Sequence, residues 1–337
     1  MQLSELYFHI EDYLLFCKSK NLARKTLKSY EQSLKLFERW AYDNKIDNVD
    51  KITATVITKY IHSLQTRGKY EVVGNETSRY SNFPENRTDL GKPVSTTTIN
   101  NYIRNLKAFC SYCYELDLIK ENPMRKIKQL PNKRTPKNFI TDEQYNTLLR
   151  AMNLDVFSER RDFVIINLLF DTGMRITECL LIQVKDIDLI KRCIFLPAEH
   201  TKGKQSRYVF YSSEMAKILR QWLKFKDLYT ESDFLFSTSR GNKLKNTYFE
   251  SNFRKYIKRV GLENITPHCL RNNFAKRFLM AGGNIYVLSK ILGHSSVVVT
   301  EKAYLDLTTD DIRQTYQAFS PLSVMKKKWV CETFSVK

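Results

Sequence analysis

The chain has 337 residues, with 55 Lys and Arg against 36 Asp and Glu, and a formal net charge of +19. Hydrophobic residues make up 42% and aromatic residues 12% of it, which is enough for one or two cores and excludes a wholly disordered or low-complexity protein. The most apolar run, residues 163–170, is far shorter than the roughly 20 residues that span a bilayer, so no transmembrane helix is expected.

The N-terminus and the cysteines favour a cytoplasmic protein. Residues 1–16 mix acidic with apolar side chains and lack a basic stretch followed by a small-residue cleavage site, so no signal peptide is expected. Seven scattered cysteines fit a reducing compartment better than a disulfide framework. Cys110 and Cys113 form a CxxC pair on an apolar helical stripe, without further Cys or His at zinc-finger spacing. We interpret them as core thiols and expect no metal site.

The charge is spread over both halves of the chain. Residues 1–137 carry 24 Lys and Arg against 15 Asp and Glu, and residues 138–337 carry 31 against 21. A basic tail on a neutral enzyme would not give this division, whereas two domains that both face a polyanion would. A generally basic protein without such a partner is the alternative, and the composition favours nucleic acid.

The first part of the chain, residues 1–123, predicts a helical bundle. Apolar residues recur at helical spacing over residues 6–17, 27–41 and 56–64. Residues 67–94 break this pattern with Gly, Pro and polar residues, which predicts an inserted loop or short hairpin. Residues 95–98 then supply N-cap candidates for a fourth helix, whose apolar stripe extends to Cys113.

A basic segment, residues 124–139, follows the bundle. It contains six Lys and Arg and two Pro and shows no helical period, so we interpret it as an interdomain linker. Such a linker is either simply solvated or lies along a phosphate backbone. In the second case the candidates for DNA-backbone contacts are Arg125, Lys126, Lys128, Lys133 and Arg134.

The second domain, residues 140–320, is predicted to be mostly helical with a small β-sheet. It opens with a capping box at residues 141–144, and a basic tail, residues 321–337, follows it. The pattern predicts a long apolar helix at residues 158–171, strands at 192–196 and 207–211 joined by a hairpin turn, a short strand at 234–236, and helices from there to about residue 318.

Two segments place Arg next to a helix start. Arg175 follows a Thr-Gly turn between two apolar helices, and Glu178 lies one turn further on the same face. Such a carboxylate can orient the guanidinium, although a purely structural ion pair is the alternative. Thr266-Pro267 starts another helix, with His268 and Arg271 on one face of its first turn. This arrangement is a phosphate site in outline, or else a capped surface helix.

Two further side chains lie near the C-terminal end. Leu292-Gly293-His294 ends a helix, with Gly293 as the C-cap that presents His294 beyond it. Tyr304 follows ten residues after His294. Taken alone, Tyr304 fits a half-buried core tyrosine, since the chain has 19 tyrosines.

Together, these segments resemble the tyrosine recombinase (phage integrase) family. The matching motifs, in order, are TGMRITE with Arg175, TKGKQSR with Lys202, HCLR with His268 and Arg271, LGH with His294, and then Tyr304. The resemblance covers nearly the whole chain. It implies a mainly α protein with a small β-sheet, in which a helical, SAM-like core-binding bundle precedes an α+β catalytic domain.

The resemblance implies a site-specific recombinase that cleaves and rejoins DNA through a 3′-phosphotyrosyl intermediate and a Holliday junction. Tyr304 would attack the scissile phosphate while Arg175 and Arg271 grip its non-bridging oxygens. The ester keeps the bond energy, so no metal, ATP or other cofactor is expected.

The resemblance also assigns the remaining roles. Lys202 is the expected general acid, His268 the base or proton acceptor near the tyrosine, and His294 a hydrogen-bond donor to the phosphate, while Glu178 supports the site from behind. Lys204 is the alternative to Lys202, which is preferred because Arg207 lies five residues after it, as the family pattern requires. The spacing of ten rather than nine residues before Tyr304, and the insertion at residues 67–94, depart from the commonest pattern.

Partners follow from the same resemblance. They are double-stranded DNA with inverted-repeat core sites and further copies of the chain, as a dimer on one site and a tetramer at synapsis, in the cytoplasm at the nucleoid. A helix at residues 308–319 and the basic tail are expected to dock into a neighbouring protomer. Integration and excision of a mobile element is the favoured role. Xer-like resolution of chromosome or plasmid dimers, a type IB topoisomerase activity and a catalytically silent accessory protein are the alternatives.

Overall fold

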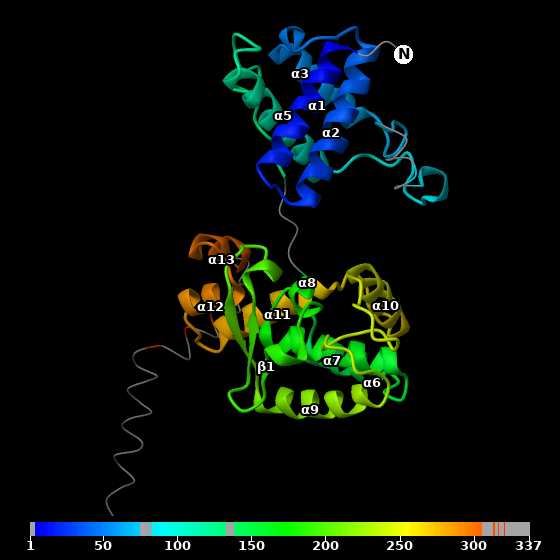
Figure 1. The fold of residues 1–337 in the computed structure, drawn as a ribbon, viewed down its shortest axis with the longest axis vertical. Coiled ribbons are helices and arrows are strands. Elements are labelled where there is room, and N and C mark those ends of the chain that lie inside the picture. Colours follow the sequence, from blue (N-terminus) through cyan, green and yellow to red (C-terminus); the bar gives the residue numbers. More distant parts are fainter. Residues whose placement is uncertain are drawn as a thin grey trace, which may run out of the picture. The chain divides into compact units, whose positions relative to one another are not determined.

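The structure is a computed structural model that describes residues 4–74, 80, 83–132, 138–304, 313, 316 and 320. The chain divides into two compact units, residues 1–134 and 135–337 (Figure 1). The described part of the first unit is helical, and the second adds a three-stranded sheet to its helices. The predicted fold class, mainly α with a small β-sheet, is confirmed. No helix in the described part of the chain has both the length and the apolar character needed to cross a membrane.

The N-terminal unit contains the four predicted helices. They are α1 (Glu5–Ser19), α2 (Arg24–Asp43), α3 (Ala54–Thr66) and α5 (Thr96–Glu115), with short 3-10 turns η1 (Val49–Lys51) and η2 (Pro84–Asn86). Ser4, Thr53 and Ser95 each accept a hydrogen bond from a first-turn backbone N–H, which fixes where three of these helices begin. The apolar stripes read from the sequence form one buried core, so the helices are held mainly by the burial of these stripes.

Both thiols of the CxxC pair lie in this core. Cys110 and Cys113 are each 1% exposed, and burial raises the pKa of Cys113 to about 12 and that of Cys110 further. Thiols with such values are not nucleophiles at neutral pH. Among the described residues no group of three or more His, Cys, Asp or Glu is placed to hold a metal ion.

The N-terminal unit continues past residue 123, where the sequence analysis placed its end. Met124 is fully buried in its core, and the Asn100 side chain both donates to and accepts from the backbone of Leu130. Arg125, Lys126 and Lys128 are exposed. The first residues of the predicted linker therefore pack on the helices, because apolar side chains alternate with the basic ones. Lys133 and Arg134 lie outside the described residues.

The two ends of the insertion at residues 67–94 are hydrogen-bonded to each other. Gly68 and Pro93 form an antiparallel bridge, and the backbone N–H groups of Lys69 and Gly91 donate to the carbonyls of Lys92 and Lys69. The Glu71 carboxylate also accepts a hydrogen bond from the Gly68 backbone. The described part of the insertion is therefore tied together next to the start of α5.

The second unit, residues 135–337, combines helices with a small antiparallel sheet of order β1-β2-β3. Its helices are α6 (Asp142–Arg150), α7 (Phe157–Thr172), α8 (Ile176–Cys179), α9 (Ser213–Asp227), α10 (Asn246–Arg259), α11 (Pro267–Met280), α12 (Ile285–Leu292) and α13 (Val297–Tyr304), with 3-10 turns η3 (Val184–Asp186) and η4 (Ala198–His200). Its strands are β1 (Ile187–Asp188), β2 (Cys193–Leu196) and β3 (Arg207–Phe210).

Several predictions for this unit are confirmed and one is wrong. The capping box of Thr141 and Gln144 is present, and β2 and β3 pair antiparallel around the predicted hairpin turn. Residues 234–236 do not form a strand, since Phe234 makes only an isolated bridge with Gln183. The predicted helix at residues 308–319 and the basic tail lie outside the described residues, apart from single positions.

Helix α7 lies at the centre of this unit and packs against both α9 and α11 (Figure 1). Its apolar residues are buried on almost every side, among them Ile165, Ile166, Leu168 and Leu169, which explains the continuous apolar run in the sequence. A helix fixed in this way places its C-terminal end firmly. The Thr-Gly turn that follows it is the first part of the candidate site.

Candidate active site

The C-terminal end of α7 meets α11 at a glycine. Gly173 caps α7 with φ +64, a left-handed conformation that glycine adopts without strain. A Cβ added there would also lie 2.3 Å from the ring of Phe274 on α11. Glycine is required for both reasons, and the turn it forms, which leads to Arg175 at the N-cap of α8, packs against α11.

Arg271 on α11 holds two helix ends together. Its side chain donates to the carbonyl of Gly173 at 2.6 Å and to that of Leu292, at the end of α12, at 2.8 Å. The same guanidinium lies 3.0 Å from Nε2 of His294. Arg271 is only 2% exposed. It therefore carries a buried positive charge at the point where α7, α11 and α12 meet.

His294 is held at both ring nitrogens. Gly293 caps α12 with φ +63, as predicted, and His294 follows it. Its Nδ1 lies 2.7 Å from the hydroxyl of Thr300, which is fully buried on α13. Because a guanidinium only donates, Nε2 is the acceptor from Arg271 here, and Nδ1 carries the proton and donates to Thr300.

Glu178 is a buried carboxylate between two guanidiniums. It is fully buried and accepts from the side chain of Arg175 at 2.9 Å, from its backbone N–H at 3.0 Å, and from Arg207 at 2.7 and 3.2 Å. Burial acts to raise the pKa of Glu178, but the hydrogen bonds and charges of Arg207 and Arg175 outweigh it and hold that pKa below its ordinary value. The carboxylate is therefore ionised at neutral pH.

Arg175 is the more accessible of the two predicted phosphate-gripping arginines. Its side chain is 24% exposed, whereas that of its partner Glu178 is 0% exposed. The Glu178 carboxylate holds the guanidinium through Nη1, and the Arg175 side chain stays partly accessible to solvent. The predicted pairing of Arg175 with Glu178 is present in the structure.

Arg207 is a site residue that the sequence indicated only by its spacing of five residues from Lys202. Its guanidinium pairs with Glu178 through two nitrogens, and its Nε donates to the carbonyl of Ile291 at 3.2 Å. The sequence placed Arg207 at the end of the turn that carries Lys202 and Lys204, and this position was the only indication of its role. Its partners lie 29 and 84 residues away in the chain, so no local pattern could reveal them.

Lys202, its alternative Lys204 and His268 lie at the surface of this unit. Lys202 and Lys204 are exposed on the turn before β3. The backbone N–H of Lys204 donates to the carbonyl of Thr201, and neither lysine side chain forms a hydrogen bond or ion pair with another described residue. His268 is exposed in the first turn of α11, one turn before Arg271. The buried part of the site is therefore preorganised, and its proton-transfer candidates lie at the surface.

Tyr304 is the last residue of α13, and its side chain lies outside the described residues. Helix α13 packs against both α11 and α12. Tyr304 follows Thr300, the hydrogen-bond partner of His294, by four residues. The backbone thus brings the predicted nucleophile to within about one helical turn of a residue that contacts the cluster.

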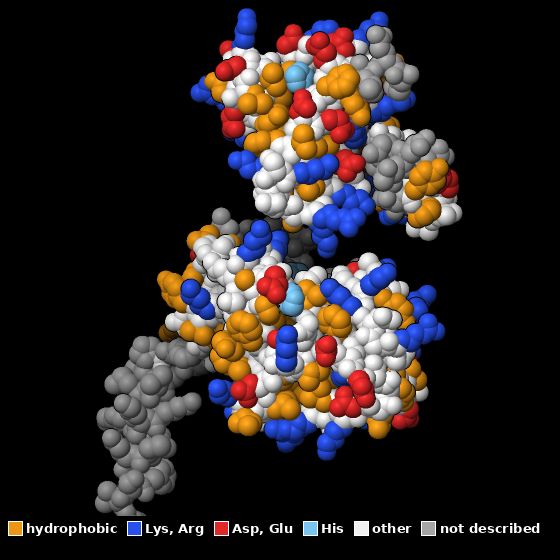
Figure 2. All heavy atoms as spheres, in the orientation of Figure 1, with side chains coloured by type: hydrophobic (Ala, Val, Ile, Leu, Met, Phe, Trp, Pro, Cys, Tyr) orange, Lys and Arg blue, Asp and Glu red, His pale blue; other side chains and the backbone are white. Residues whose placement is uncertain are grey.

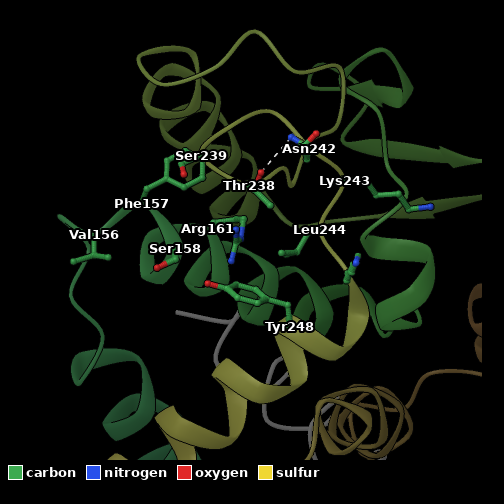
Figure 3. A pocket seen from close by; sticks show the side chains of 11 residues that line it. Val156, Phe157, Ser158, Arg161, Thr238, Ser239, Asn242, Lys243, Leu244 and Tyr248 are labelled. Atoms are coloured by element: carbon green, nitrogen blue, oxygen red, sulfur yellow. Dashed lines mark hydrogen bonds between the residues drawn. The ribbon is translucent and has the colours of Figure 1, made fainter. Parts of the chain in front are cut away.

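A separate cavity of about 740 Å³ lies between the start of α7, residues 238–245 and α10 (Figure 3). It contains none of the predicted catalytic residues. Arg161, which is 1% exposed, points toward Tyr248 there and pairs with Asp162 at 2.8 Å. Asp162 also accepts from Asn252 and Tyr256 on α10. These bonds join α7 to α10, and we assign the pair a structural role.

Comparison with known proteins identifies both units. Residues 138–310 match the Phage integrase family, and residues 7–129 match the Phage integrase SAM-like domain. The chain is 28% identical over 325 residues to tyrosine recombinase XerC of Thermodesulfovibrio yellowstonii, covering 94% of this chain and 97% of that protein. It is 26% identical over 312 residues to XerC of Bacillus subtilis, covering 90% and 97%.

Solved structures show the same fold. The Tn1549 transposon integrase in complex with transposon right end DNA gives a TM-score of 0.70 at 18% identity and covers 94% of this chain and 99% of that one. The recombinase XerH bound to difH substrate gives 0.62 at 20% identity, covering 92% and 83%. Together with the match over residues 138–310, which is more than half of the chain, these findings show that the chain belongs to the phage integrase family of tyrosine recombinases, enzymes that cleave and rejoin DNA strands.

Proposed function

We propose that this protein is a site-specific DNA recombinase that works through a 3′-phosphotyrosyl intermediate. The observation that carries the proposal is the cluster at the end of α7, in which Glu178 fixes Arg175 and buried Arg271 lies beside His294. We further propose that the helical N-terminal unit is the core-binding domain and that residues 140–320 form the catalytic domain.

In this proposal, two guanidiniums and an imidazole bind the scissile phosphate. Arg175 and Arg271 hold the non-bridging oxygens and offset the negative charge that grows as the phosphorus becomes pentavalent. His294 donates to the same phosphate from Nε2, which requires a proton on that nitrogen. Binding of the phosphate therefore protonates the ring or moves its proton from Nδ1, and replaces the present contact with Arg271.

The bond changes balance without a cofactor. The Tyr304 oxygen forms a bond to phosphorus as the bond from phosphorus to the 5′-oxygen breaks, His268 takes the phenolic proton, and Lys202 gives a proton to the leaving 5′-oxygen. Ligation to a new 5′-hydroxyl reverses each step. We prefer Lys202 over Lys204 because the family pattern has an arginine five residues after its lysine, and Arg207 meets this spacing for Lys202.

DNA binding by the basic linker can be tested through salt dependence. Basic side chains occur on both units on the face shown in Figure 2, mixed with acidic ones. If Arg125, Lys126 and Lys128 each contact a phosphate, replacing all three by Gln should lower the slope of log affinity against log salt by about 2.7. Gel-shift titrations between about 50 and 200 mM salt measure this slope.

The matched control removes the same charge elsewhere. Lys217, Arg220 and Lys224 are exposed on α9, which packs against α7 in the lower part of its unit in Figure 1, away from α11. Replacing these three by Gln should leave the slope nearly unchanged. An equal decrease for both triple variants would show that only net charge matters and would contradict backbone contacts by residues 125–128.

We propose that the biological role is integration and excision of a mobile element. The fold shared with the Tn1549 transposon integrase and the insertion at residues 67–94 support this role. The test uses a supercoiled plasmid that carries two copies of the repeats flanking the gene, and a second plasmid without them. Recombinant circles from the first plasmid alone support the proposal. Relaxation of both would identify a topoisomerase, and no reaction with either would indicate a silent accessory protein.

The assembly proposed for this reaction is a dimer on one inverted-repeat core site and a tetramer at synapsis, in the cytoplasm at the nucleoid. The SAM-like N-terminal domain and the DNA-bound relatives support a protein that acts on duplex DNA. Analytical ultracentrifugation with one-site and two-site DNA measures the stoichiometry. Truncation after Leu307 should abolish the tetramer if the C-terminal segment docks in a neighbouring protomer, and an intact tetramer would contradict that docking.

A further inference from the structure

Arg207 joins three separate parts of the candidate site. It is the first residue of β3, and its guanidinium forms a two-point ion pair with Glu178 on α8. Its Nε donates to the carbonyl of Ile291 in the last turn of α12. The side chain of Arg207 is 12% exposed. One side chain thus links the hairpin, the carboxylate that orients Arg175, and the helix that presents His294.

The end of α12 is shaped to receive this guanidinium. A Cβ added at Gly293 would lie 2.9 to 3.0 Å from three atoms of the Arg207 guanidinium group. Glycine at this position therefore does more than adopt the left-handed conformation of a C-cap. It also leaves the space in which Arg207 lies, so the turn that carries His294 and the base of the hairpin fit each other.

The hairpin turn that carries Lys202 directly precedes Arg207, the first residue of β3. Arg207 lies opposite Leu196 in the β2–β3 register, and residues 197–206 connect the two strands. Thr201 closes the turn through its bonds with Gln205, and Lys202 follows Thr201 directly. The internal bonds of the turn and the pairing of its two strands connect it to its base, and Arg207 bonds that base to α8 and α12.

We propose that Arg207 is a positioning residue that sets the distance between the lysine of the hairpin and the bound phosphate. The inference rests on the proposed function, because it assigns Arg207 to protonation of the leaving 5′-oxygen by Lys202. Lysine cannot replace it, because one ammonium cannot bond to both carboxylate oxygens in a fork and to the Ile291 carbonyl as well. A shift of about 1 Å in a catalytic group lowers a rate by about 10²-fold.

The experiment separates positioning of the general acid from every other effect of Arg207. Single-turnover cleavage is measured on two nicked duplexes, one ordinary and one with sulfur in place of the bridging 5′-oxygen at the scissile phosphate. The sulfur leaves as a thiolate when its bond to phosphorus breaks, so its departure needs no proton. Arg207→Lys should lose about 10²-fold on the ordinary substrate and recover most of that loss on the sulfur substrate, as should Lys202→Ala.

Control variants distinguish loss of general-acid positioning from loss of phosphate binding and from misfolding. Arg175→Lys weakens the grip on the phosphate oxygens, so sulfur should not restore its cleavage. Arg192→Gln, exposed at the other end of the same strand pair, should cleave like the wild type. Arg207→Gln provides a second variant, and thermal melting identifies any variant that fails to fold. Lys204→Ala, read on both substrates, decides between the two hairpin lysines.

The possible results divide cleanly. Recovery of Arg207→Lys on the sulfur substrate supports positioning of the general acid. An equal loss on both substrates, or no loss on either, overturns the inference while leaving the proposed function intact, because the wild type still cleaves. If the wild type forms no covalent product with either duplex, the proposed function itself is contradicted.

Discussion

Replacing Tyr304 by phenylalanine should reduce single-turnover strand cleavage to the uncatalysed background. The substitution removes only the phenolic oxygen, which is the one atom that forms the bond to phosphorus in the proposed reaction. DNA affinity should not change, because the groups proposed to bind phosphate are on α8, α11 and the end of α12. Gel assays of a labelled nicked duplex measure cleavage, and gel shifts on the same duplex measure binding.

The control for this substitution is Tyr286→Phe. Tyr286 lies on α12 and is 66% exposed, so loss of its hydroxyl should leave cleavage at the wild-type rate. Cleavage by Tyr304→Phe at a rate near that of the wild type would contradict its assignment as the nucleophile. An equal loss in both variants would show that the assay responds to something other than the attacking oxygen.

Arg271→Lys should have the next largest effect, a decrease in cleavage of about 10²- to 10³-fold, the range found when one preorganised donor is removed from a transition-state site. Lysine keeps the charge, but one ammonium cannot reach Gly173, Leu292 and His294 together. The two carbonyls would lose a buried donor, at a cost of about 1–3 kcal/mol each. The variant should therefore melt at a lower temperature as well as cleave slowly.

The catalytic and structural effects can be separated. Cleavage is measured well below the melting temperature of the variant, where almost all of the protein is folded. Arg277→Lys is the matched control on the same helix, since Arg277 is 44% exposed and pairs with Asp142 at the surface. This control should cleave and melt like the wild type. A folded Arg271→Lys protein that cleaves at the wild-type rate would contradict a role for Arg271 at the phosphate.

Much of the buried cluster could be predicted from local sequence. The spacing of Arg175 and Glu178 predicted their ion pair, and the Gly293 C-cap predicted how His294 leaves α12; both are confirmed. Such features depend on residues within about one helical turn of each other, which the helical period determines. The catalytic roles of these residues stay predictions.

Other features depended on contacts between distant segments. Arg207 pairs with Glu178 and contacts Ile291, and neither partner is near it in the sequence. Met124 is buried in the N-terminal core, a contact that the basic pattern of residues 124–139 does not reveal. Strand β1 has only two residues, which is too short for an alternating pattern to indicate.

The central claim is a covalent bond between Tyr304 and a DNA 3′-phosphate. A duplex nicked next to the cleavage site loses its short 5′-hydroxyl fragment by diffusion, so the covalent product accumulates with wild-type protein. Protease digestion followed by mass spectrometry then identifies the residue that carries the nucleotide. We predict one adduct, on Tyr304, at a 3′-phosphate and with a free 5′-hydroxyl on the released fragment. An adduct on another residue, attachment to a 5′-phosphate, or no adduct would contradict the proposed mechanism.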